Sequence, residues 1–148
     1  MSIETKPHTV LTVDVVSRLI DETFPGIHAN GRWIHVESVG LRAARVRMSA
    51  VPSTIRPGGT ISGPAMFTLA DFAIYAALIA NLGEPAIAAV TANLNINFLL
   101  RPEPVDMIGE GRLIRIGRRL AYAEVSLFSF GRDDVIAHAT GSYALPRS

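Results

Sequence analysis

The segment from residue 64 to residue 82, PAMFTLADFAIYAALIANL, is the longest apolar run in the chain. Its 19 residues come close to the roughly 20 that an α-helix needs to cross a bilayer. Asp71 stands near its middle, however, where a carboxylate costs about 2.5–3.5 kcal/mol on insertion scales, and flanking basic residues and an aromatic belt are missing. We therefore expect a helix that is buried on most sides inside a folded domain.

The residues around this segment set the limits of the helix. Ser62 is suited to cap its first turn, and Pro64 falls where a missing N–H has no helical acceptor to lose. Gly83 and Pro85 end it after Leu82.

The chain beyond the helix has the pattern of strands. Residues 90–98, VTANLNINF, are polar at odd numbers and apolar at even numbers, which is typical of a half-buried strand. Further strands are expected over 105–116, 120–130 and 135–145, and their short connections require antiparallel pairing. Before the long helix, the pattern predicts a short amphipathic helix over 12–24, extended segments at 33–36 and 41–51 with a turn at Gly40, and a loop over 52–59. The fold class is therefore α+β, a curved antiparallel sheet of about six strands around one long helix.

Composition limits the function. The chain has 148 residues, which suits a single domain over 1–148, with residues 1–10 expected to be flexible. A net charge of +1 argues against binding to nucleic acid or to an anionic membrane surface. With 49% apolar and 18% charged residues, the chain has surplus apolar surface to bury in a core or between subunits. There is no cysteine, and the polar residues 1–8 do not resemble a signal peptide, so a cytoplasmic location is expected.

Asp71 is the first candidate for chemistry. Thr68, Asp71 and Tyr75 share one stripe of the long helix, and the other residues from 65 to 82 are apolar except Asn81. A carboxylate in such a setting either bonds a backbone group or faces solvent at an edge, or it is a catalytic group in an apolar cleft. The residues alone leave both interpretations open.

Two other features have two interpretations each. Residues 58–63, GGTISG, lead into the helix N-terminus, where free N–H groups favour an oxyanion, although an ordinary loop and cap would look the same. Arg112, Arg115, Arg118 and Arg119 are either a solvated face or a phosphate-binding rim. The four histidines are scattered, so the sequence predicts no metal site and no Ser-His-Asp triad, and no nucleotide-binding loop is present.

From about residue 30 to 145 the chain resembles the hotdog-fold acyl-CoA thioesterases of the PaaI-like, phenylacetate-type family. The resemblance rests on the order of several short stretches, each weak by itself: 59–63 (GTISG), 69–71 (LAD), 90–99 (VTANLNINFL), 101–102 (RP), 109–112 (GEGR), 117–119 (GRR) and 136–141 (IAHATG).

The resemblance implies three catalytic positions. The catalytic carboxylate of the family maps onto Asp71, the N–H that binds the oxyanion onto Gly63, and the hydroxyl that orients the attacking water onto Thr91. Ser62 and Pro64 stand where the family has His and Gly, and an upstream Asn falls at about Arg56.

The expected activity is hydrolysis of a small or medium acyl-CoA to the acid and CoA, with CoA entering only as part of the substrate and no cofactor. The carboxylate is either a general base or a nucleophile. The alternatives are a non-catalytic acyl-CoA-binding protein, which the replaced His and Asn favour, and a hotdog hydratase or dehydratase. The expected substrate-binding residues are Ser62, Thr68, Tyr75, Asn97, Phe98, Arg118 and Arg119.

Helix geometry adds a constraint of its own. Gly63 and Asp71 are eight residues apart, about 12 Å along a helix axis, so one carbonyl cannot touch both groups of one subunit. A site that uses both must lie between two copies, which predicts a homodimer or homotetramer. Strict alternation also turns Thr91 away from its own helix, so it must meet the partner's site unless a bulge redirects it.

Overall fold

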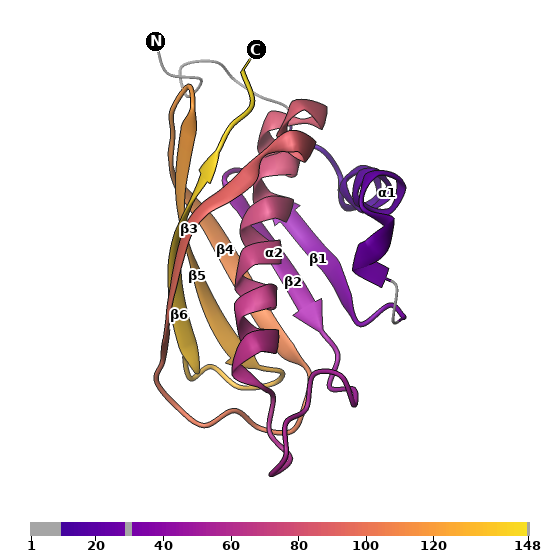
Figure 1. Ribbon diagram of the computed structural model, residues 1–148, viewed down its shortest axis with the longest axis vertical. Helices are drawn as coiled ribbons and strands as arrows, with labels where there is room; N and C mark the ends of the chain where they lie inside the picture. The colour runs from indigo at the N-terminus through magenta and orange to yellow at the C-terminus, as the bar shows by residue number, and fades with distance from the viewer. Residues whose placement is uncertain (1–9, 29–30, 148) are drawn as a thin grey trace.

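A computed structural model of the protein describes residues 10–28 and 31–147. It shows one long helix lying across a curved sheet, with a short helix beside it (Figure 1). The elements in chain order are α1 (Val13–Thr23), η2 (Pro25–His28), β1 (Ile34–Gly40), β2 (Ala43–Met48), α2 (Gly63–Leu82), η3 (Glu84–Ala88), β3 (Val90–Phe98), β4 (Met107–Ile116), β5 (Leu120–Ser129) and β6 (Ala137–Ala144). This is the expected α+β hotdog arrangement; the sequence pattern did not predict the two short 3₁₀ helices.

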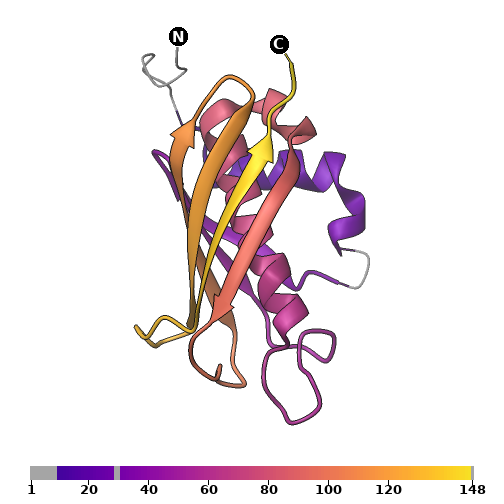
Figure 2. The ribbon, with the colours of Figure 1, turned by 60° about the vertical axis from the view of Figure 1, so that its left-hand side comes forward.

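The sheet has six strands in the order β1-β2-β4-β5-β6-β3, and every neighbouring pair is antiparallel. Strand β3 is therefore an outermost strand, although only η3 separates it from α2 in the chain (Figure 2). The first hairpin turns at residues 41–42 rather than at Gly40, because Arg42 takes a positive φ of 57° and donates its N–H to the side chain of Asn81 at 2.8 Å.

Helix α2 forms the centre of the core. Fourteen of its residues are buried, and the hydroxyl of Ser62 caps it by accepting from the N–H of Ala65 at 3.2 Å. By length and composition α2 could cross a membrane, but 78% of its most apolar window is buried within the fold. Gly109 and Gly111 of β4 let it come close to the sheet, since a Cβ on Gly111 would lie 3.2 Å from the carbonyl oxygen of Ala73.

Helix α1 packs against β1 and α2, and its residues Val16 and Ile20 belong to the buried core. Its start and the segment after it are pinned by polar contacts. Thr12 caps the first turn, and Asp21 pairs with His28 and with Arg32, each at 3.0 Å. The hydrogen bond from Arg32 lowers the pKa of Asp21. The expected helix over 12–24 is confirmed within one residue at each end, whereas residues 1–9 of the segment expected to be flexible lie outside the described residues.

Candidate active site

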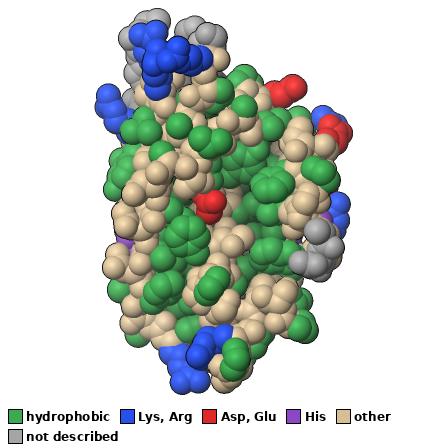
Figure 3. All heavy atoms as spheres, in the orientation of Figure 1, with side chains coloured by type: hydrophobic (Ala, Val, Ile, Leu, Met, Phe, Trp, Pro, Cys, Tyr) green, Lys and Arg blue, Asp and Glu red, His purple; other side chains and the backbone are tan. Residues whose placement is uncertain are grey.

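Asp71 lies at the edge of a cavity of about 440 Å³ that is bounded by α1, α2 and the start of β3. On the face shown in Figure 3, an acidic side chain lies over α2 and is surrounded by hydrophobic side chains. The expected stripe is confirmed in position, because Thr68, Asp71 and Tyr75 all line this cavity. The cavity is also lined by Thr23, Phe24, Ile27, Phe72, Ile87, Ala89, Val90, Thr91 and Tyr143.

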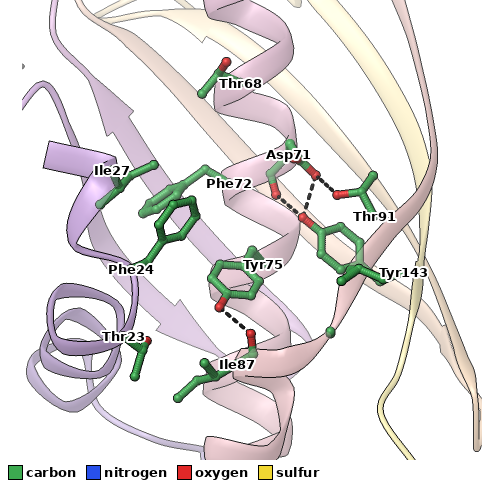
Figure 4. Close-up of a pocket in the computed structure, with 12 residues that line it drawn as sticks. Thr23, Phe24, Ile27, Thr68, Asp71, Phe72, Tyr75, Ile87, Thr91 and Tyr143 are labelled. Atoms are coloured by element: carbon green, nitrogen blue, oxygen red, sulfur yellow. Dashed lines mark hydrogen bonds between the residues drawn. The ribbon is translucent and has the colours of Figure 1, made fainter. Parts of the chain in front are cut away.

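The Asp71 carboxylate receives two hydrogen bonds from the sheet, and both end on the same oxygen. The hydroxyl of Thr91 donates to Oδ1 at 2.8 Å, and the phenol of Tyr143 donates to Oδ1 at 2.5 Å. Figure 4 shows both side chains approaching Asp71 together, on the side opposite Phe24 and Ile27. The sequence left two interpretations of Asp71: a residue that bonds a backbone group or faces solvent, and a catalytic group in an apolar cleft. The structure differs from the first because side chains hold the carboxylate, and it agrees with the second in that the carboxylate faces an apolar cavity.

A bulge in β3 brings Thr91 to this position. In the pairing of β3 with β6, the register shifts between Thr91 and Asn93. Before the shift Thr91 lies opposite Tyr143, whose side chain is buried on the inner face, and after it Leu94 lies opposite Gly141 on that same face. The alternation therefore changes phase at the bulge, and Thr91 turns inward to the carboxylate of its own chain. The sequence predicted that Thr91 either meets the site of a partner subunit or is redirected by a bulge, and the structure shows the bulge.

Sequence reasoning missed Tyr143. Its side chain is only 3% exposed, and its ring stacks on that of Tyr75 with 6.3 Å between centroids. Burial, followed by the negative charge of Asp71, raises the pKa of Tyr143 well above its ordinary value, so the phenol stays protonated and remains a donor. The alternation of the last strand could have shown that Tyr143 points inward. Alternation does not show which residue of the helix an inward side chain contacts.

The other end of the cavity is apolar. Phe24 meets Tyr75 edge-on with 6.5 Å between ring centroids. The hydroxyl groups there are already bonded, since Tyr75 donates to the carbonyl of Ile87 at 2.8 Å and Thr23 donates to that of Leu19 at 2.5 Å. A ligand group at this end would therefore meet hydrocarbon and satisfied polar groups.

Gly63 lines a different hollow from Asp71. Its neighbours there include Phe98, and the side chains of Arg56 and Arg101 lie at the same hollow. Basic side chains are visible at both ends of the molecule in Figure 3, and those of this hollow are arginines. Within residues 10–28 and 31–147, the N–H of Gly63 has no hydrogen-bond acceptor. One chain thus keeps the two main catalytic candidates in separate hollows.

The remaining predicted site residues are spread over the molecule. Arg118 and Arg119 line a third hollow at the β4–β5 turn, apart from both Asp71 and Gly63. Asn97 lies opposite His138, which puts it on the face turned away from α2. Within the described part of the chain, no three His, Asp or Glu side chains are grouped so as to hold a metal ion.

Comparison with known proteins places this chain among thioesterases. A family model described as the thioesterase superfamily matches residues 58–136. A crystal structure from Silicibacter sp. TM1040, provisionally described as a thioesterase, shares 35% identity, covers 93% of this chain and 94% of its own, and superposes with a TM-score of 0.82. Zebrafish thioesterase superfamily member 2 shares the fold at 22% identity, with 92% and 99% coverage and a TM-score of 0.79. A phenylacetic acid degradation-related protein from Ralstonia eutropha JMP134 does so at 20% identity, with 86% and 98% coverage and a TM-score of 0.72. No curated protein matches the chain.

Proposed function

This chain belongs to the thioesterase superfamily and is a thioester hydrolase, and we propose that its substrates are small or medium apolar acyl-CoA thioesters and that Asp71 carries the reaction. The observation that supports the proposal most strongly is the position of the Asp71 carboxylate, held by Thr91 and Tyr143 at the edge of an apolar cavity. A carboxylate so placed has its charge stabilised by donors while it faces a reacting group.

In the proposed reaction, the thioester carbonyl lies beside Asp71 and the acyl group occupies the cavity. Asp71 either takes a proton from the attacking water or attacks the carbonyl carbon itself to give a mixed anhydride that water then opens. In both cases the C–S bond breaks, and CoA leaves as the thiol. Single-turnover hydrolysis in ¹⁸O-labelled water tests for the second path, because label enters Asp71 only when water opens a mixed anhydride at the aspartyl carbonyl carbon.

The oxyanion partner in this proposal is the N–H of Gly63 in a second copy of the chain. Within one chain the two groups lie about 12 Å apart along α2 and face different hollows. The outer edge of β3 supports a second copy, since it is a nine-residue strand with no partner beyond it among the described residues, and long bare edges favour pairing. We propose a homodimer built at this edge, whether or not dimers pair further.

The cavity supports an apolar acyl group. Its far end is walled by Phe24, Ile27 and Ile87, and its hydroxyl groups are already bonded. Burying a polar acyl tail there would leave that tail without partners. For the phosphates of CoA, Arg118 and Arg119 remain the proposed contacts, while Arg56 and Arg101 lie nearer to Gly63 and are a second cationic pair of the same chemistry.

The alternative is a protein that binds acyl-CoA without hydrolysing it, which the replacement of the family's His by Ser62 favours. A thiol-release assay over a panel of acyl-CoA substrates discriminates the two, because a binder retains the thioester. Membership of the thioesterase superfamily favours turnover.

Replacement of Asp71 tests the proposal. Asp71→Asn keeps the size of the side chain but removes its charge and basicity, so we expect kcat to fall by about 10²–10⁴-fold. Thiol release from acyl-CoA measures the rate, and circular dichroism with size-exclusion chromatography verifies that the variant stays folded and associated. Asp134→Asn, at an exposed aspartate in the turn before β6, is the matched control and should retain the wild-type rate. Full hydrolysis by Asp71→Asn would rule out this mechanism.

A further inference from the structure

We infer that Tyr143 is a positioning residue that anchors Oδ1 of Asp71 and thereby makes Oδ2 the reacting oxygen. The inference rests on the proposed role of Asp71. It concerns a residue outside the 58–136 segment that matches the family model. It starts from an asymmetry, because the two oxygens of one carboxylate have different surroundings.

The asymmetry is in the hydrogen bonds. Oδ1 accepts from Thr91 at 2.8 Å and from Tyr143 at 2.5 Å, and the second distance is typical of a charge-assisted O–H···O⁻ bond. Oδ2 accepts no hydrogen bond from any residue that the structure describes. Donors concentrate negative charge on the oxygen they bind and hold it in place, so the free oxygen keeps its lone pairs available for water or for a carbonyl carbon.

Tyr143 is the more rigid of the two donors. Its ring is buried and stacked on Tyr75, and its hydroxyl also lies 3.1 Å from the backbone carbonyl of Asp71. The phenol can therefore rotate little without losing its contacts. Thr91 is exposed at the cavity edge and belongs to the strand that bulges, so it adds a second donor but less restraint.

This arrangement makes a kinetic prediction. Tyr143→Phe keeps the stacked ring and leaves Thr91 as the single donor to Oδ1, so the carboxylate can rotate and exchange its oxygens. Misalignment of a reacting group costs rate rather than binding, and we expect kcat to fall by about 10- to 100-fold with KM changed by less than about threefold. A purely structural role would instead lower the melting temperature and alter kcat and KM together.

The experiment compares steady-state hydrolysis of one acyl-CoA by the wild type, Tyr143→Phe, Thr91→Val and the double variant. Thr91→Val removes the other donor at an exposed position where folding is not at risk, so it tests the anchored oxygen even if Tyr143→Phe is unstable. Tyr75→Phe is the contrast, since its hydroxyl bonds Ile87 rather than Asp71 and its effect should fall on KM.

The outcomes separate this inference from the function it rests on. A fall in kcat at constant KM in both single variants, deeper in the double variant, supports Tyr143 as the anchor. Hydrolysis with kcat within twofold of the wild type in a folded Tyr143→Phe variant, or no deeper loss in the double variant than in Thr91→Val, overturns the inference and leaves the proposed function standing. A wild type that binds acyl-CoA without releasing thiol overturns the proposed function itself.

Discussion

At the scale of single residues, the site depends on close approaches that a methyl group would block. Gly141 of β6 lies under the bulged part of β3, and a Cβ there would stand 2.7 Å from a methyl carbon of Leu94 and 2.9 Å from the carbonyl oxygen of Asn93. Those two residues follow the bulge that turns Thr91 inward. The absence of a side chain at Gly141 therefore helps to keep the bulge that brings Thr91 to Asp71.

Gly141→Ala should destabilise the protein by about 1–3 kcal/mol, because the added methyl group overpacks the contact with Leu94 and with the backbone of β3. Urea unfolding at a fixed protein concentration measures the loss. Gly40→Ala is the matched control, since it also lies in a strand and a Cβ there would meet nothing within 4 Å. Equal unfolding midpoints for the two variants would contradict the close approach.

At the scale of elements, the sequence predicts what depends on local pattern. The apolar run from 64 to 82 and its caps place α2 to within a residue, and alternation places β3 at 90–98. Asp71 is found in the same way, as a lone carboxylate on an apolar helix. The contact with Tyr143 is not, because it joins residues 72 positions apart through the register of β6 and β3. The bulge after Thr91 has no local signature either, since the letters on both sides continue to alternate.

The wall formed by the end of α1 makes a prediction about acyl length. Phe24 covers one side of the cavity and meets Tyr75 edge-on, so Phe24→Ala should lengthen the space beyond Asp71. We expect the ratio of kcat/KM for a longer acyl-CoA over a shorter one to rise about 10-fold, which is the usual effect of one or two methylene groups in an apolar pocket.

Kinetics on a series of straight-chain acyl-CoA substrates measures this ratio. Leu41→Ala, which truncates an apolar side chain 71% exposed at the first hairpin turn, should leave it unchanged. A constant ratio in Phe24→Ala would show that the acyl group does not reach α1.

At the scale of the whole molecule, the apolar surplus of the sequence has two destinations. Much of it is inside, where α2 is buried over most of its length. Part of the rest is exposed at the ends of the outer strand β3, where Val90, Phe98, Leu99 and Leu100 are each more than half exposed. Exposed apolar side chains at both ends of a bare strand edge suit a second copy of the chain. Composition suggested this division, but only the structure shows that these exposed apolar residues lie at the ends of β3, one of the two outer strands.

A site shared between copies predicts rescue between two inactive variants. Asp71→Asn removes the carboxylate, and Gly63→Pro removes the N–H at a first helical position where proline fits and Ser62 before it is already extended. Each variant alone should be inactive. Co-refolded subunits should regain about a quarter of the wild-type rate, because half of the dimers are mixed and each has one intact site. Thiol release after co-refolding measures it, and no recovery would place both groups in one subunit.

The bulge in β3 also has a consequence for how such a strand tolerates insertion and deletion. The strand has two phases, one for residues up to Thr91, which serve the carboxylate, and another from Asn93 on, which packs the sheet against α2. Loss of Ala92 would join the phases and rotate either the Thr91 hydroxyl or every packing side chain to the wrong face. A change of length by one residue therefore disturbs every position beyond it at once, whereas a single substitution leaves both phases of the strand in register.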